Sequence, residues 1–344
     1  MPILLNVNEN THPVPPEVSA AIAADVAACA PGLNRYPDRE FTELRQRLAD
    51  YLGHGLTADH VWAANGSNEV LQHILQAFGG PGRIAMGFPP TYSMYPLLAS
   101  GTDTAYVRGV RSEDFGLSAE SAAEQVAASG ANIVFLCSPN NPTGTALGLD
   151  VVEAVYEAGE ASHAIVIVDE AYAEFAMIGT RSALNLLPGR DRLIVSRTMS
   201  KAFALAGARL GYMAAAPEIA DALRLVRLPY HLSAVTQATA NAALKHVDVL
   251  LATVEDIKMQ RDRIVDELKR LGLSPAASDS NFVFFGGMEH PGRIWQGLLD
   301  AGVLIRDVGI PGHLRVTAGT EAETTAFLNR LEELLEPEPS GARG

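Results

Sequence analysis

Cysteine is scarce in this sequence, because Cys29 and Cys137 are too few for a framework of disulfide bonds. Basic residues are also few: 26 Lys and Arg stand against 40 Asp and Glu, and the net charge is −14. This balance argues against a nucleic-acid-binding protein, which needs a basic face. The nine histidines show neither HExxH nor another paired spacing of ligands, so we predict no metal site.

Long apolar runs and targeting signals are missing as well. No run approaches the length of a membrane span, and residues 1–6 lack the basic region and the apolar length of a signal peptide. Together with the two cysteines, these absences predict a cytoplasmic protein. The chain also has no P-loop and no G-x-S-x-G turn. Its 344 residues are 48% hydrophobic and only 19% charged, which predicts a large buried core.

Strand-length apolar runs alternate with helical patterns in the first two thirds of the chain. The runs cover 61–64, 83–86, 104–107, 133–137, 165–168, 193–196 and 212–215. Helices are expected between them at 67–78, 92–99, 118–128, 150–158 and 217–227. Because several runs are apolar throughout, they predict a parallel or mixed sheet with helices on both faces, in the α/β class.

The two ends of the chain have a different organisation. The first forty residues are rich in Asn and Pro and predict an extended arm with a short helix at 16–28, before a helix at 42–52. Further helices are expected at 233–245, 248–271, 291–301 and 321–335, with strands at 282–285, 303–307 and 313–317. We therefore predict an arm and part of the small domain at 1–40, a large domain at 41–245, a small α+β domain at 246–335 and a frayed tail at 336–344.

Lys201 is the residue most indicative of chemistry. Between Thr198 and Ala216, the only charged side chains are those of Lys201 and Arg209. A lysine among small and apolar residues is desolvated, which lowers the amine pKa toward the nucleophilic free form. The hydroxyls of Thr198 and Ser200, with the guanidinium of Arg209, predict a phosphate site beside this amine. A phosphate next to a lysine that can form a Schiff base indicates pyridoxal phosphate (PLP).

Other polar side chains follow the predicted strands, which is where α/β proteins bind ligands. Asp169 ends an apolar strand, and a buried carboxylate needs a partner such as a protonated pyridine nitrogen. Tyr172 and Asn141 offer a hydroxyl and an amide to a ring oxygen, and Tyr92 offers a face for stacking. The helix start at 64–69 offers free N–H groups to an anion. An ordinary helix cap at 64–69 and core packing of Tyr92 stay open as alternatives.

Taken in order, these stretches resemble the motifs of the fold-type I PLP-dependent aminotransferases over essentially the whole chain. Within that family, they are most similar to the histidinol-phosphate aminotransferase branch. The matching stretches are 5–10, 35–38, 65–69, 90–95, 139–144, 168–172, 198–203, 228–233 and 314–319. The implied fold is a large domain with a mostly parallel sheet covered by helices, and a smaller α+β C-terminal domain. One departure is Thr11-His12, where many relatives have Pro followed by an aromatic residue.

The resemblance implies a role for each matched residue. Catalysis would fall to Lys201, which bonds PLP covalently, and to Asp169 and Tyr172. The implied cofactor-binding residues are Ser67, Asn68, Tyr92, Asn141, Asp169, Tyr172, Thr198, Ser200, Lys201 and Arg209. Tyr36 would reach the PLP phosphate of the neighbouring subunit, so the resemblance also implies a homodimer. The implied substrate-binding residues are Arg315 for the carboxylate, with Arg306 and Tyr230 for the phosphate.

The activity implied by the resemblance is amino transfer in histidine biosynthesis. L-Histidinol phosphate and 2-oxoglutarate would give imidazole acetol phosphate and glutamate by a ping-pong reaction. The nearest alternative is an aromatic amino-acid aminotransferase of the same family, which needs a ring pocket but no phosphate site; the segment 228–233 favours the first. Two further alternatives belong to other classes of protein. The first is a PLP-dependent decarboxylase, which is distinguished by the release of carbon dioxide. The second is a ligand-sensing domain of a transcription regulator, which would follow a basic DNA-binding module.

Overall fold

The fold is described by a computed structural model that covers residues 2–335. Its central element is a mixed sheet. Its strands are β2 (Val61–Ala64), β3 (Ile84–Gly87), β4 (Ala105–Arg108), β5 (Ile133–Cys137), β6 (Ile165–Asp169), β7 (Leu193–Thr198) and β8 (Gly211–Ala215). Their order is β2-β8-β7-β6-β5-β3-β4. Only the pairs that involve β8 are antiparallel. The predicted α/β sheet is confirmed, with small shifts at the strand ends.

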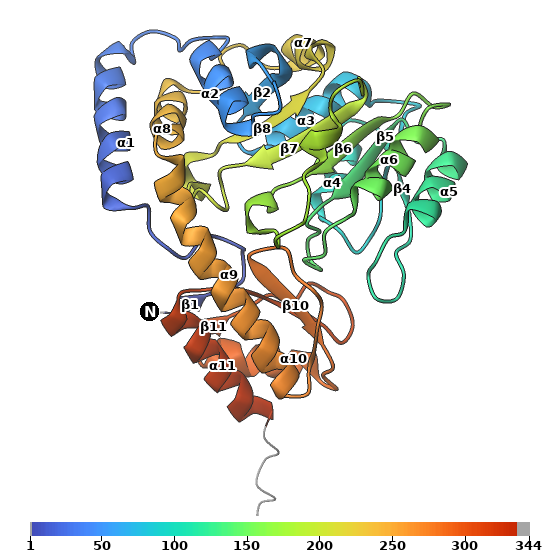
Figure 1. The fold of residues 1–344 in the computed structure, drawn as a ribbon, viewed down its shortest axis with the longest axis vertical. Helices are drawn as coiled ribbons and strands as arrows, with labels where there is room; N and C mark the ends of the chain where they lie inside the picture. The colour runs from blue at the N-terminus through green and yellow to red at the C-terminus, as the bar shows by residue number, and fades with distance from the viewer. Residues whose placement is uncertain (1, 336–344) are drawn as a thin grey trace, which may run out of the picture.

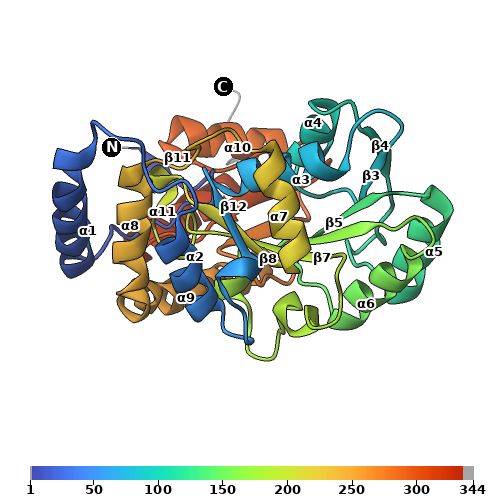
Figure 2. The same ribbon diagram turned by 90° about the horizontal axis from the view of Figure 1, so that it is seen from above.

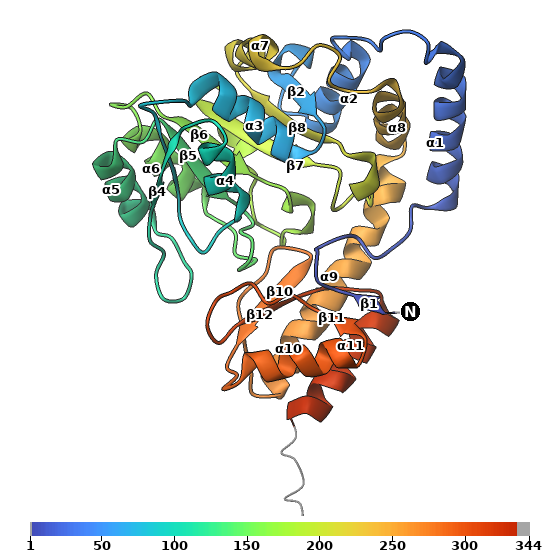
Figure 3. The ribbon, with the colours of Figure 1, turned by 180° about the vertical axis from the view of Figure 1, so that it is seen from behind.

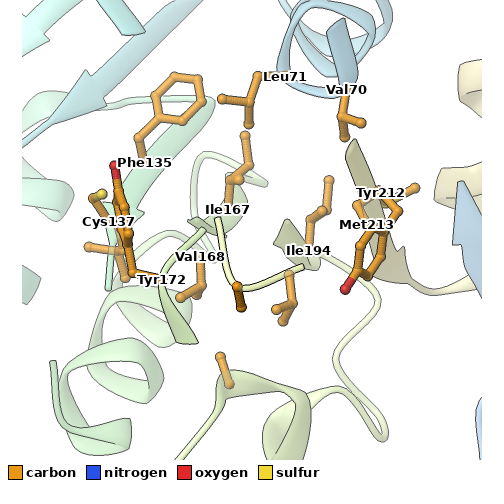
Figure 4. Packing of buried hydrophobic residues seen from close by; sticks show 14 of the residues in the cluster. Val70, Leu71, Phe135, Cys137, Ile167, Val168, Tyr172, Ile194, Tyr212 and Met213 are labelled. Carbon is orange, nitrogen blue, oxygen red and sulfur yellow. The ribbon is translucent and has the colours of Figure 1, made fainter. Parts of the chain in front are cut away.

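Helices cover both faces of this sheet, as Figure 2 shows from above. On one face lie α3 (Ser67–Phe78), α4 (Met94–Ser100) and α7 (Pro217–Val226); on the other lie α5 (Ala119–Ser129) and α6 (Leu149–Ala158). Val70 and Leu71 of α3 point toward Ile167, Ile194 and Met213 of the strands (Figure 4). Coverage on both faces explains why the strands are apolar throughout instead of alternating.

A smaller lobe contains the C-terminal residues together with the start of the chain (Figures 1 and 3). Its antiparallel sheet places β10 (Phe282–Gly286) between β12 (Leu314–Thr317) and β9 (Ser274–Pro275). The N-terminal strand β1 (Ile3–Leu4) pairs in parallel with β11 (Val303–Leu304). Its helices are α10 (Pro291–Asp300) and α11 (Glu321–Leu335). The strands β1 and β9 are two residues long, too short to give a sequence pattern.

Among the remaining helices, one long helix connects the two lobes. Helix α9 (Val247–Arg270) runs from the larger lobe into the smaller one, and α1 (Pro16–Cys29) packs along α8 (Ala234–Leu244) (Figure 1). Helix α2 (Thr42–Leu52) lies beside β2. Short 3₁₀ turns stand at Ala30–Gly32, Ala58–His60, Ala173–Phe175, Ala183–Leu186 and Ala206–Ala208.

The sequence also provided expectations for the domain division, the C-terminal tail and membrane spans. The domain division at residues 40 and 245 stays a prediction, and the tail predicted for 336–344 lies outside the described residues. Within residues 2–335, no helix combines the length and the apolar character that crossing a membrane requires.

Candidate active site

A cavity of about 880 Å³ lies where the two lobes meet, at the carboxyl ends of β5, β6 and β7. Twelve of the fourteen residues proposed from the sequence line it: Ser67, Asn68, Tyr92, Asn141, Asp169, Tyr172, Thr198, Ser200, Lys201, Arg209, Arg306 and Arg315. The N-terminal segment 6–9 forms another part of the wall. The cavity therefore lies at the edge of the sheet that open α/β folds use for ligands.

Asp169 is the last residue of β6 and is buried at the base of this cavity. Its Oδ2 accepts a hydrogen bond from the hydroxyl of Tyr95 at 2.9 Å. Its Oδ1 is buried and accepts no hydrogen bond from the described residues. Burial raises the pKa of this carboxyl to about 6. A cation against Oδ1 would satisfy the free oxygen and favour the ionised form, which fits the protonated nitrogen of a pyridine ring.

Asn141 and Tyr172 converge on one point of the cavity wall. The Tyr172 hydroxyl accepts from Asn8 Nδ2 at 3.1 Å and from Asn141 Nδ2 at 3.4 Å. The Asn141 Oδ1 accepts from Arg315 Nη1 at 2.6 Å, which orients the amide with its nitrogen toward Tyr172. Burial also raises the pKa of Tyr172, so its hydroxyl keeps its proton. This arrangement offers an amide and a hydroxyl donor to a ring oxygen.

Lys201 projects from the loop after β7 into the same cavity. Its Nζ donates a hydrogen bond to the backbone oxygen of Val7 at 3.2 Å. Burial, aided by the cations of Arg315 and Arg209, lowers the pKa of Lys201 to about 8, although Glu9 acts in the opposite direction. The lowered pKa makes the free base, the form that a nucleophile or proton acceptor requires, more accessible than it is for an ordinary lysine.

The polar groups expected to form a phosphate site are neighbours in the structure. Thr198 Oγ1 donates to Ser200 Oγ at 3.0 Å, and Arg209 Nη1 donates to the same Ser200 oxygen at 3.4 Å. The Arg209 guanidinium lies against Gly66, where any Cβ would collide with it. Gly66 also precedes the first turn of α3, whose Ser67 lines the cavity. Two hydroxyls, a guanidinium and a helix N-terminus together fit a phosphate dianion.

Arg306 and Arg315 lie side by side in the smaller lobe. Their backbones form an antiparallel bridge, with each N–H donating to the other's carbonyl at 2.9 Å. The sequence-based expectation that a returning strand brings both into one cleft is confirmed, since both line the cavity. Burial lowers the pKa of Arg315 to about 10, and Arg306 adds to this shift. Two adjacent cations make this wall suited to an anionic group.

Tyr36 and Tyr230 are the two proposed residues that do not line the cavity of their own chain. Their rings stack on each other with centroids 4.4 Å apart and planes 9° apart. Both lie on the surface, and Tyr36 is 79% exposed. For Tyr36 this position agrees with the expectation that it serves a neighbouring subunit. Tyr230 likewise lies outside the cavity of its own chain, so the expectation that it binds a substrate together with Arg306 stays a prediction.

Sequence reasoning gave no role to two residues that hold the site together. Tyr95 orients Asp169, and Asn8 orients Tyr172. Both belong to stretches that carried the family resemblance, 90–95 and 5–10, but each contact spans more than seventy residues of chain. Local sequence patterns do not reveal which distant side chain a buried hydroxyl or amide will meet.

A buried ionic network fixes the loop that follows Asp169 and carries Tyr172. The Arg197 guanidinium donates to Glu170 Oε2 at 2.7 Å and to Glu174 Oε1 at 3.1 Å. These two carboxylates flank Tyr172 in the sequence. Because all three charged groups are largely buried and mutually paired, the network holds the loop in one conformation. Within residues 2–335, no group of three or more His, Cys, Asp or Glu is arranged to hold a metal ion.

The α/β fold and this cavity are those of a PLP-dependent aminotransferase, and comparison with known families gives the same class. The model of the family "Aminotransferase class I and II" matches residues 1–331, so the chain belongs to that family.

Individual relatives are more specific. The chain is 81% identical to the histidinol-phosphate aminotransferase of Paenarthrobacter aurescens, over 98% of this chain and 90% of that protein. It is 56% identical to the histidinol-phosphate aminotransferase of Thermobifida fusca, over 95% of this chain and 89% of the relative. Among solved structures, the histidinol-phosphate aminotransferase of Sinorhizobium meliloti in complex with pyridoxal-5′-phosphate superposes with a TM-score of 0.86 at 27% identity. That superposition covers 96% of this chain and 90% of the other.

Proposed function

We propose that this protein is a PLP-dependent aminotransferase that transfers the amino group between L-histidinol phosphate and 2-oxoglutarate in histidine biosynthesis. The observation that carries the proposal is the single cavity that joins Lys201, the unpartnered Oδ1 of Asp169 and the paired cations of Arg306 and Arg315. The 81% identity to a curated histidinol-phosphate aminotransferase supports the particular substrate.

The residues around the cavity suit each part of the cofactor. The phosphate would be held by Thr198, Ser200, Arg209 and the first amides of α3. Asp169 would pair with the ring nitrogen, and Asn141 and Tyr172 would donate to the ring oxygen. Tyr92 lines the same space and is fixed by its hydroxyl, which donates to Asn68 Oδ1 at 3.1 Å. When bound, PLP supplies an electron sink for the carbanion that forms as the substrate loses its α proton.

The protein groups then perform the remaining tasks. Asp169 stabilises positive charge at the ring nitrogen, which keeps the electron sink strong. Lys201 Nζ, with its pKa lowered to about 8, takes a proton from the substrate and returns one. Arg315 holds the carboxylate of glutamate or 2-oxoglutarate, and Arg306 contributes to holding the phosphate of histidinol phosphate. The net charge of the protein is −14, which repels an anionic substrate. The local arginines therefore have to overcome this repulsion.

The phosphate of the substrate is expected to be the main determinant of substrate specificity. Charge-assisted hydrogen bonds from arginine contribute about 1.5–3 kcal/mol each, and buried cations left unpaired make rejection steep. Histidinol without its phosphate should therefore be a poorer donor by at least about 10² in kcat/KM. The purified protein is mixed with histidinol phosphate, histidinol, phenylalanine or glutamate, and the change in cofactor absorbance measures kcat/KM for each donor. Phenylalanine consumed as well as histidinol phosphate would assign the protein to the aromatic aminotransferases instead.

The two arginines serve as matched variants in the same assay. Arg306→Ala should lower kcat/KM for histidinol phosphate by about 10- to 100-fold but change that for glutamate much less. Arg315→Ala should damage both half-reactions, because each substrate carries an anion at that position. An Arg306→Ala protein that loses both activities equally would contradict the assignment of Arg306 to the phosphate.

We also propose that the protein is a homodimer with shared active sites. The stacked pair Tyr36–Tyr230 lies on the surface, and the apolar side chains of Leu33, Leu225 and Leu228, which are near it in the sequence, are exposed as well. Exposed apolar side chains of this kind are suited to contact with a second copy of the chain. In this arrangement the pair reaches the cavity of the other subunit, and Tyr36 binds the cofactor phosphate there. A cytoplasmic location accords with the two free cysteines, Cys29 and Cys137.

Mixed dimers test the shared site. Tyr36→Phe and Lys201→Ala subunits, each nearly inactive alone, should regain activity when mixed, because one site of each hybrid carries neither change. The expected recovery is about a quarter of wild-type activity at equal mixing, since half of the dimers are hybrids with one intact site. Sedimentation measured on the same samples gives the oligomeric state. A fully active monomer would rule out the shared site.

A further inference from the structure

The charges that line the cavity are strongly unequal. The cations are Arg108, Lys201, Arg209, Arg306 and Arg315, whereas the carboxylates are only Asp169 and Glu9. Asp169 is buried at the base, where its free oxygen fits the ring nitrogen of the cofactor. Glu9 is exposed to the cavity space and forms none of the ion pairs found within residues 2–335. It is therefore the carboxylate of this wall that remains available to a substrate.

The backbone around Glu9 is fixed on both sides. Asn8 is buried with a φ of 57°, and its Nδ2 donates to Tyr172 while its N–H donates to Thr317 Oγ1 at 3.1 Å. Asn10 Nδ2 donates to the Ala202 carbonyl at 3.3 Å, next to Lys201. The left-handed conformation of Asn8 turns the chain immediately before Glu9. Glu9 is thus held between two anchored asparagines, beside the reactive amine.

The proposed substrate has a group that the assigned residues do not serve. Histidinol phosphate carries an amine, a phosphate and an imidazole ring, and the first two meet Lys201 and the arginines. A cavity lined mostly by cations disfavours a ring that carries N–H donors and that becomes positively charged near pH 6.5. A carboxylate accepts such a donor in a charge-assisted hydrogen bond and favours the protonated ring.

We propose that Glu9 is a specificity-determining residue that binds an imidazole N–H of the amino donor, an inference that rests on the proposed function. Glu9 acts in the donor half-reaction only, because glutamate and 2-oxoglutarate have no ring to bind. Its carboxylate distinguishes an imidazole from a phenyl ring of similar size, since a phenyl ring offers no N–H group. By the same contact, phosphorylated amines whose side chains carry no N–H donor should bind less tightly.

Two unreactive ligands test this role by equilibrium binding to the cofactor-loaded protein. They are 3-(imidazol-4-yl)propyl phosphate and 3-phenylpropyl phosphate, which lack the amine and differ only in the ring. Isothermal titration should show the wild type binding the imidazole ligand about 10- to 100-fold more tightly than the phenyl ligand. Glu9→Ala should remove most of this preference, and Glu9→Gln, which keeps an uncharged acceptor, should retain an intermediate preference.

Kinetic measurements separate this inference from the function on which it rests. Glu9→Ala should lower kcat/KM for histidinol phosphate by about the same 10- to 100-fold and leave the glutamate half-reaction within about threefold. Glu17→Gln, an exposed carboxylate of α1 outside the cavity, serves as the control. If the wild type does not use histidinol phosphate, the proposed function fails. If it does, but Glu9→Ala keeps the preference for imidazole or weakens both ligands equally, the role of Glu9 alone is refuted.

Discussion

Replacing Lys201 by alanine is expected to abolish amino transfer, with the rate falling on the order of 10⁴-fold or more. The variant loses both the covalent attachment of the cofactor and the amine that moves the proton. Cofactor affinity should persist, because the phosphate contacts of Thr198, Ser200 and Arg209 stay in place. Single-turnover absorbance with histidinol phosphate measures the rate, and equilibrium dialysis measures the remaining PLP binding.

Borohydride reduction followed by peptide mapping identifies the attachment site directly. The chain has only four lysines, at positions 201, 245, 258 and 269, and Lys201 alone among them lines the cavity. Wild-type protein should carry the label at Lys201, and the Lys201→Ala protein should carry none. Lys258→Ala is a suitable control, because Lys258 pairs with Glu255 at 2.9 Å on α9, outside the cavity. A label on any other lysine would overturn the assignment of Lys201.

Asp169→Ala is expected to lower kcat by about 10² to 10³, with a much smaller loss of cofactor affinity. The physical reason is that Asp169 stabilises positive charge at the ring nitrogen, and a ring without that charge is a weaker electron sink. Stopped-flow measurement of the half-reaction gives the rate, and titration with PLP gives the affinity. A kcat close to that of the wild type would remove Asp169 from the mechanism.

Tyr95→Phe provides a graded comparison for the same carboxylate. It removes the hydroxyl that donates to Asp169 Oδ2 at 2.9 Å but keeps the ring, which stacks on Phe135 with centroids 4.5 Å apart. One hydrogen bond to a charged group contributes about 1.5–3 kcal/mol, so Tyr95→Phe should slow the half-reaction less than Asp169→Ala does. An effect equal to that of Asp169→Ala would instead indicate that the substitution displaces the carboxylate.

Local sequence patterns were sufficient to predict the strands of the central sheet and the sheet edge proposed to carry the chemistry. The β5 and β6 segments are runs of five buried residues, and such continuous apolar runs indicate a sheet covered on both faces. Asn141 follows β5, Asp169 ends β6 and Lys201 follows β7, and in a parallel arrangement the carboxyl ends meet at one edge. This is why residues up to sixty positions apart were expected to share one site.

The sequence did not reveal the long-range contacts that complete the site. The strands β1 and β11 are two residues long, and their pairing, with the hydrogen bond from Thr317 N–H to the Leu5 carbonyl, brings the N-terminal segment beside the C-terminal strands. That pairing places Asn8 near Tyr172 and Glu9 near Lys201, although more than 160 residues separate the members of each pair. Nor does any local pattern indicate that Tyr230 stacks on Tyr36.

The amino-acid sequence by itself determined the α/β class and the order of the strands along the chain, and it singled out Lys201 as the lysine proposed to react, because hydrophobic periodicity and isolated charge are local properties. Only the tertiary structure decided that Oδ1 of Asp169 lacks a partner, that Arg306 lies beside Arg315, and that the chain start closes the cavity. Those features depend on which surfaces pack together, and packing is settled by contacts between segments that are distant in the chain.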